Sequence, residues 1–207
     1  SSDVCSSDLD VLLEKAGIAV VKGICRAEAA ILLRAFAKVQ TTGLPWVIVK
    51  WAMSLDGRIT RPPGESQWLT GTEARHDVQH LRAEVDLIMT SGETVRQDLP
   101  ALTIRVPELL EGRLQPWRLV LTQHPDRMPL HAPLFSDEHA QRTIVRGGDV
   151  EEILRNVVRE QGVLCVLVEA GGKLVADLLE KKLVDEVVGY MAPMITGGLP
   201  AVAGQGM

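Results

Sequence analysis

Apolar runs rich in β-branched residues alternate with helix-forming segments from residue 46 onward, and this alternation constrains the fold more than any other feature. The run at 46–53 is apolar apart from one charge, as expected for a strand that is covered on both faces. Strands that alternate with helices predict an α/β fold, with a mostly parallel central sheet and helices on both faces. We expect strands at 46–53, 87–90, 118–122, 143–145, 163–168 and 186–191, and helices at 26–36, 70–86, 149–160 and 173–182.

The helix expected at 70–86 carries a start signal. Thr70 and Glu73 have the spacing of a capping box, in which each side chain can satisfy a free N–H group at the helix entrance. We therefore expect the helix to begin at Thr70 and to pack on the sheet through an apolar face. The residues of that face recur at helical spacing: Ala74, Val78, Leu81 and Val85.

The composition fits an ordinary globular protein. The 207 residues are 46% hydrophobic, enough for one substantial core, and the net charge of −5 gives no general reason to bind nucleic acid or an anionic membrane. Cys5, Cys25 and Cys165 lie far apart without C-x-x-C spacing, which disfavours a disulfide framework and a thiolate metal site. Apolar stretches are shorter than the roughly 18 residues that cross a bilayer. We expect a cytoplasmic protein with no nucleic-acid or membrane partner.

The N-terminal part of the chain differs from the rest. Residues 1–9 repeat the triplet S-S-D in a segment without amphipathic period, and we expect them to be non-native sequence. The stretch T-T-G-L-P ends the helical region before residue 46, and its glycine and proline mark a boundary. We therefore divide the chain into residues 1–9, 10–43 and 44–207.

Two charged residues stand where the predicted sheet should be apolar. Lys50 lies inside the first strand, on the same face as Ile48 and Ala52, and an unpaired buried ammonium there would be costly. Glu169 directly follows the strand at 163–168, at the carboxyl end where open α/β sheets bind ligands. Two alternatives stay open: Lys50 reaches water from an edge strand, and Glu169 is a solvated loop carboxylate. We favour a pairing of Lys50 with Glu169, directly or through a polar ligand.

Gly171 and Gly172 follow at the entrance of the next expected helix. Two glycines let the backbone approach a ligand closely, and the free N–H groups and dipole of a helix start favour an anion. The spacing is not G-x-G-x-x-G, so a Rossmann fingerprint is not supported. An ordinary tight turn between strand and helix explains the two glycines about as well.

Three arginines could gather at the same crevice. Arg75 and Arg82 share one side of the helix at 70–86, with Gln79 between them, and Arg105 follows an extended segment. Guanidinium groups suit a substrate phosphate because they can bind it in bidentate fashion. The alternative for each of them is a solvated surface arginine.

The pair His76 and His80 could in principle bind zinc from one helix face. The metalloprotease motif requires a glutamate directly after the first histidine, and this chain has the shorter Asp77 there. No third ligand is evident in the sequence. We therefore expect no metal site.

Five motifs stand along the chain in a specific order. They are V-K-W-A-M-S-L-D-G-R-I-T, G-E-S-Q-W-L-T, L-R-A-E-V-D-L-I-M-T-S-G-E-T-V-R-Q-D-L-P-A-L-T-I-R, V-E-A-G-G-K-L-V-A-D-L-L and V-D-E-V-V-G-Y-M-A-P. From about Leu44 to the C-terminus, they resemble the reductase domain of the bifunctional riboflavin-biosynthesis deaminase/reductase. The resemblance implies a dihydrofolate-reductase-like fold, an NADPH cofactor, a phosphorylated pyrimidine substrate and a homodimer. It also implies reduction of the ribosyl group of 5-amino-6-(5-phosphoribosylamino)uracil to a ribityl chain, with hydride going to C1′ of an opened, imine-like ribose.

The resemblance further implies roles for individual residues. Lys50 and Glu169 would be the catalytic pair that holds the pyrimidine and its polar edge. The substrate contacts would be Ser66, Arg82, Leu102, Arg105 and Glu169. The NADPH contacts would be Ala52, Trp68, Thr94 and Asp98, together with Gly171, Gly172, Lys173, Leu174, Val175, Ala176 and Asp177 at the helix entrance.

The chain departs from the family pattern in several respects. Leu99 replaces the acidic residue of the usual D-D-P, and the strand at 118–122 ends in T-Q where the family often has D-S. Residues 10–43 resemble the tail of the deaminase domain, whose zinc motifs are absent, and 44–207 resembles a reductase domain that lacks its last strands. The alternatives are a stand-alone reductase of the same fold that acts on another pteridine- or pyrimidine-like substrate, a His76/His80 metal hydrolase, and an inactive fragment.

Overall fold

The computed structural model describes residues 8–60 and 69–202, and the chain divides into two units, residues 1–34 and 35–207. In the first unit, none of the described side chains is buried. No helix in the described ranges has the length and apolar character needed to cross a membrane. The helices of the first unit are α1 (Asp8–Lys15) and α2 (Arg26–Leu32).

A separate helix, α3 (Arg34–Thr42), precedes the sheet. The chain leaves helical geometry at Leu33, so the single helix expected at 26–36 is wrong. Lys38 of α3 donates to the carboxylate of Asp185 at 2.5 Å. This contact ties α3 to the second unit, which therefore begins before the boundary expected at residue 44.

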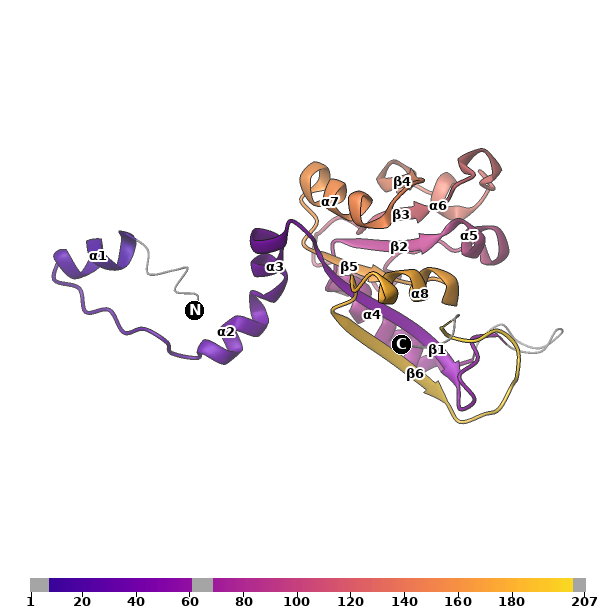
Figure 1. The fold of residues 1–207 in the computed structure, drawn as a ribbon, viewed down its shortest axis with the longest axis horizontal. Helices are drawn as coiled ribbons and strands as arrows, with labels where there is room; N and C mark the ends of the chain where they lie inside the picture. Colours follow the sequence, from indigo (N-terminus) through magenta and orange to yellow (C-terminus); the bar gives the residue numbers. More distant parts are fainter. Residues whose placement is uncertain (1–7, 61–68, 203–207) are drawn as a thin grey trace. The chain divides into compact units, whose positions relative to one another are not determined.

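A six-stranded sheet forms the centre of the second unit (Figure 1). The order across the sheet is β4-β3-β2-β5-β1-β6, and every strand pairing is parallel. The α/β fold with a parallel sheet, predicted from the alternation of elements, is confirmed. The strands are β1 (Trp46–Ser54), β2 (Leu87–Ser91), β3 (Trp117–Leu121), β4 (Thr143–Arg146), β5 (Cys165–Val168) and β6 (Glu186–Ala192).

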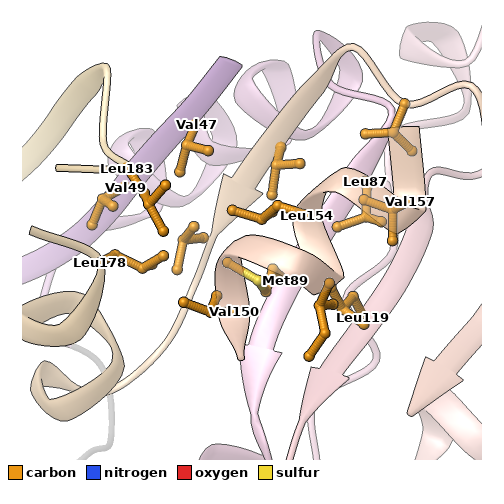
Figure 2. Packing of buried hydrophobic residues seen from close by; sticks show 14 of the residues in the cluster. Val47, Val49, Leu87, Met89, Leu119, Val150, Leu154, Val157, Leu178 and Leu183 are labelled. Atoms are coloured by element: carbon orange, nitrogen blue, oxygen red, sulfur yellow. The ribbon is translucent and has the colours of Figure 1, made fainter. Parts of the chain in front are cut away.

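Helices cover both faces of this sheet. Side chains alternate between the two faces along each strand, so each face presents apolar side chains that a layer of helices can bury. On one face, α7 (Val150–Gln161) and α8 (Gly172–Glu180) pack on apolar side chains of β1, β2, β3 and β5 (Figure 2). On the other face lie α4 (Thr72–Ala83) and α5 (Gly92–Asp98). The prediction of helices on both faces is therefore confirmed.

Helix α7 shows how the sequence builds one of these layers. Asp149 caps its start by accepting hydrogen bonds from the N–H groups of Glu151 and Glu152, and Gly162 ends it in a left-handed conformation. Burying each large apolar side chain of its inner face stabilises the fold by about 1.5–3 kcal/mol. These side chains recur at helical spacing: Val150, Ile153, Leu154 and Val157.

The start of α4 differs from the expectation. The helix begins at Thr72 with Gly71 at its N-cap, and no side chain caps it. The capping box of Thr70 and Glu73 is therefore wrong. The carbonyl of Thr70 instead accepts from Arg75 Nη1 at 2.7 Å, so this residue belongs to the approach to the helix.

Helix α5 was not expected from apolar periodicity, because seven residues are too few to show it. The available signal is its cap: Ser91 Oγ accepts from the N–H group of Thr94 at 3.2 Å. Leu99 follows in the left-handed region with φ 46°, where an acidic or asparagine side chain is better tolerated than leucine. The other short helical elements are η1 (Pro107–Leu109), η2 (Pro125–Arg127), α6 (Pro133–Ser136) and η3 (Ala140–Arg142).

The strand order creates a switch point between β2 and β5. From β2 the chain continues to β3 and β4 on one side, and from β5 it continues past β1 to β6 on the other. Connections that leave neighbouring parallel strands in opposite directions open a crevice at the carboxyl ends, and open α/β sheets bind ligands there. The residues that directly follow β2 and β5 are therefore the first place to look for a site.

Candidate active site

Glu169 directly follows β5, and its backbone is fixed at the switch point. Its N–H group donates to the carbonyl of Met89 in β2 at 2.9 Å, and its carbonyl accepts from the Thr90 hydroxyl at 2.7 Å. Thr90 is completely buried. The backbone of Glu169 therefore bridges the two strands between which the crevice opens.

The carboxylate of Glu169 joins two cations in one cluster. Arg82, from α4, donates from Nε to Oε1 at 2.7 Å and from Nη2 to Oε2 at 3.2 Å. Lys50, from the inner strand β1, donates to Oε2 at 3.3 Å. The exposed fractions are only 11% for the Glu169 and Arg82 side chains and 16% for Lys50. The predicted pairing of Lys50 with Glu169 is confirmed, and both solvated alternatives are wrong.

The charge of Glu169 follows from its two partners. Burial by itself raises the pKa of this carboxyl group, because it disfavours the charged form. Attraction from Arg82 and then from Lys50, with their hydrogen bonds, outweighs burial and lowers the pKa to about 2. Glu169 is therefore ionised at neutral pH, and it compensates two buried positive charges.

The Glu169 cluster, formed by Lys50, Arg82 and Glu169, keeps hydrogen-bonding capacity for a ligand. A carboxylate has about four lone-pair sites, and Arg82 and Lys50 use three of those of Glu169. The ammonium of Lys50 has three donors, of which the contact with Glu169 uses one. The cluster can thus both accept from and donate to a ligand, which matches a polar ring edge with N–H and carbonyl groups.

The other two predicted arginines make different contacts. Arg75 donates to the Thr70 carbonyl and to the Thr72 hydroxyl at the start of α4. Arg105 has an exposed side chain, while its backbone N–H group is held by Gln79 at 2.7 Å. Of the three arginines predicted to gather at the crevice, Arg82 is therefore the one that contacts Glu169.

Leu102, a predicted substrate contact, is 4% exposed and has φ 52°. Its side chain packs in the apolar cluster of Ile48 and Leu167. Any substrate contact at this position would thus come mainly from its backbone. The next carbonyl, that of Thr103, accepts from Arg82 Nη1 at 2.8 Å, so this segment borders the cluster.

The two predicted glycines at the start of α8 have different surroundings. A Cβ atom at Gly171 would meet no atom within 4 Å, whereas one at Gly172 would lie 2.8 Å from the carbonyl oxygen of Pro200 and 2.9 Å from that of Ala201. Close packing of the chain on itself therefore explains Gly172. Gly171 leaves the helix start open, with exposed Lys173 beside it.

The remaining predicted cofactor residues lie on α5, β1 and α8 or outside the described ranges. Thr94 is in the first turn of α5, Asp98 is at its end, and Ala52 lies in β1 opposite Tyr190. Ser66 and Trp68 fall outside the described residues. Four further predicted residues follow in α8: Leu174, Val175, Ala176 and Asp177. The side chains of the first three are buried or half-buried, and Asp177 is ion-paired with Lys181. The N–H groups of Leu174 and Val175 donate to the Gly171 carbonyl, so the anion donors of this helix start are the N–H groups of Gly172 and Lys173.

Sequence reasoning missed two polar pairs on this face of the sheet. Tyr190 of β6 donates to Asp77 of α4 at 2.6 Å, and burial, with the nearby Asp77 charge, raises the Tyr190 pKa. Arg118 of β3 is 1% exposed and forms a bidentate pair with Asp137 at 2.7 and 2.9 Å. A charged residue in a strand predicted to be buried was the available signal for Arg118, as it was for Lys50.

The histidine pair has no metal-binding surroundings within the described part of the chain. The His76 and His80 rings lie 5.0 Å apart, centre to centre, and Asp77 is engaged by Tyr190. No group of three or more His, Cys, Asp or Glu side chains that could hold a metal is found across residues 8–60 and 69–202.

A family model described as the RibD C-terminal domain matches residues 45–207. The chain belongs to the RibD C-terminal domain family. Within it, the riboflavin biosynthesis protein RibD of Escherichia coli (strain K12) is 36% identical over 213 residues, which cover 89% of this chain and 58% of that protein. This chain thus spans little more than half the length of the curated RibD relatives that it matches.

Solved structures related to the RibD C-terminal domain family have the same fold. RibD from Acinetobacter baumannii matches with a TM-score of 0.83 and 33% identity, over 93% of this chain and 58% of that chain. A deaminase/5-amino-6-(5-phosphoribosylamino)uracil reductase from Thermotoga maritima matches with a TM-score of 0.81 and 28% identity, over 95% and 58%. The resemblance seen in the sequence motifs and its dihydrofolate-reductase-like α/β fold are confirmed.

Proposed function

We propose that this chain catalyses the NADPH-dependent reduction of the ribosyl group of 5-amino-6-(5-phosphoribosylamino)uracil to a ribityl chain, a step of riboflavin biosynthesis. The observation that carries the proposal is the buried Glu169 cluster at the switch point of the sheet. The relative from Thermotoga maritima, which this chain matches over 58% of its length, is named as a reductase of this compound.

The Glu169 cluster suits the pyrimidine end of the substrate. A uracil ring presents N–H donors and carbonyl acceptors in one plane. The ionised carboxylate has one lone-pair site left for an N–H group, and Lys50 has N–H groups left for a carbonyl oxygen. Because the cluster is largely buried, these bonds form away from competing water and orient the ring.

Arg105 suits the phosphate end. Its backbone N–H group donates to Gln79, and its side chain is exposed. It lies two residues after Thr103, whose carbonyl accepts from Arg82 of the Glu169 cluster. A guanidinium offers a planar fork of donors that matches phosphate oxygens. The assignment of Ser66 as a second phosphate contact stays a prediction.

The residues around the start of α8 fit the phosphates of NADPH. The open position at Gly171, the first-turn N–H groups of α8 and the cation of Lys173 form a donor set for an anion. Thr94 and Asp98 lie on α5, which begins directly after the neighbouring strand β2. When bound, NADPH would supply the hydride, and the protein would supply binding, orientation and exclusion of water.

An assay of NADPH oxidation with the phosphorylated substrate tests the proposal. Arg105→Ala should raise KM roughly 10- to 100-fold, as expected for the loss of a charged hydrogen bond. The matched control is Arg113→Ala, an exposed arginine at the amino end of β3, which should leave KM unchanged. No NADPH oxidation by the wild-type chain would refute the function, and turnover of a substrate without phosphate at equal efficiency would favour the other pyrimidine or pteridine class.

A further inference from the structure

Segment 101–105 has no helical or strand structure, yet largely buried side chains hold its backbone. The carbonyl of Ala101 accepts from Arg118 Nη1 at 3.0 Å. The carbonyl of Thr103 accepts from Arg82 Nη1 at 2.8 Å. Both guanidinium groups are also paired with carboxylates, so the start and the middle of the segment are attached to rigid ion pairs.

Two buried glutamines hold the end of the same segment. Gln115, which is 7% exposed, accepts from the N–H group of Ile104 at 2.7 Å and donates to its carbonyl at 2.9 Å. Gln79, which is 4% exposed, accepts from the N–H group of Arg105 at 2.7 Å. Because the acceptor belongs to a buried side chain with a fixed place on α4, this hydrogen bond fixes the backbone of Arg105.

Gln79 also links this backbone to the Glu169 cluster. Gln79 and Arg82 lie three residues apart on α4 and therefore on the same face of the helix. Arg82 holds both Glu169 and the Thr103 carbonyl, and Gln79 holds Arg105 two residues further on. One helix face thus sets the distance between the carboxylate and the point from which the Arg105 side chain extends.

We propose that Gln79 is a positioning residue, which sets the affinity of the site for a phosphate group through Arg105. This inference rests on the proposed function, in which Arg105 binds the phosphate of the substrate. A long, exposed arginine side chain has many rotamers, so the place of its backbone decides which points the guanidinium can reach. Without the acceptor of Gln79, the end of the segment shifts and the guanidinium is directed at the phosphate less often.

The test compares Gln79→Met, which keeps the chain length and removes the acceptor, with Gln79→Glu, which retains an oxygen at Oε1. Gln79→Met should raise KM for the phosphorylated substrate roughly 5- to 30-fold with kcat unchanged, and Gln79→Glu should restore most of the loss. Gln141→Met is the control: Gln141 is an exposed residue of η3, directly before the edge strand β4, and its replacement should change neither constant. Urea titrations of each variant check that it is folded.

A double-mutant cycle separates positioning from a general structural effect. If Gln79 acts through Arg105, Gln79→Met should add no further rise in KM when Arg105 is already alanine. Calorimetric titration with inorganic phosphate gives a second measurement that does not depend on turnover. Weaker phosphate binding by Gln79→Met supports the positioning role whether or not the chain oxidises NADPH. A failure to oxidise NADPH would refute the proposed function and leave the positioning role standing.

Three outcomes would overturn the positioning role. The first is an unchanged KM and phosphate affinity in folded Gln79→Met. The second is a further rise in KM when Gln79→Met is combined with Arg105→Ala. The third is a wild-type chain that binds no phosphate.

Discussion

Replacing Glu169 by glutamine removes the central charge of the cluster and keeps the shape of the side chain. The difference between the ordinary pKa of 4.5 and the folded-state pKa of about 2 corresponds to about 3 kcal/mol at neutral pH. The side chain is only 11% exposed, so screening by solvent reduces this value little. We expect Glu169→Gln to lower the free energy of unfolding by about 3 kcal/mol and Tm by about 6–12 °C.

The lowered pKa of Glu169 also predicts how the stability of the fold depends on pH. The folded-state pKa of Glu169 lies below the unfolded one, so its stabilisation is complete above pH 4.5 and is lost as pH falls toward 2. The stability of the wild-type chain should therefore approach that of Glu169→Gln on acidification. Adding Lys50→Met to the variant removes an ammonium that has lost its counter-charge, and should restore part of the stability at neutral pH.

Urea titrations at neutral pH and at a pH of about 3 measure both effects. Glu160→Gln is the control, because Glu160 is an exposed acid of α7 with a 4.0 Å contact to Arg146, and it should change stability by less than about 0.5 kcal/mol. A neutral-pH stability of Glu169→Gln within that margin of wild type would refute the reasoning. So would a stability difference that stays constant between the two pH values.

Three smaller changes test other parts of the fold. Asp149→Ala removes the cap of α7 and should lower the free energy of unfolding in urea by about 1 kcal/mol; no change would contradict the capping role. Leu99→Asn relieves a left-handed residue whose side chain is 37% exposed, and should raise Tm through a gain of about 1 kcal/mol, whereas a lower Tm would show that leucine packing dominates. Gly172→Ala puts a Cβ atom 2.8 Å from the Pro200 carbonyl and should speed proteolysis near the C-terminal end; equal cleavage rates would contradict the close approach.

The elements of the fold were largely readable from the sequence, because each depends on residues that are close together in the chain. The apolar period of α7 and its cap at Asp149 lie within one short segment, and the structure has both. The failures have local causes too. α5 is too short for a period to be seen, and Gly71 took the cap position that Thr70 was expected to fill.

The site was predicted in part, for two different reasons. Lys50 and Glu169 could be picked out because a charge in a buried strand and a carboxylate at a strand end each need a partner. Arg82 and Arg105 were predicted as phosphate or substrate contacts from their positions in the sequence and from the family motifs. Neither approach indicated that Arg82 holds Glu169, or that Gln79 holds Arg105.

The sequence alone determined which segments become strands and helices and which charges could not remain unpaired, since periodicity and burial cost are properties of neighbouring residues. Only the tertiary structure decided the partners. Glu169 is 119 residues from Lys50 and 87 from Arg82, and the strand order β2-β5-β1 and the crossing of α4 bring them together. The close approach of Pro200 and Ala201 to Gly172 is likewise a contact between distant residues that the sequence did not indicate. Contacts between distant residues depend on how whole layers pack, and no local pattern contains that information.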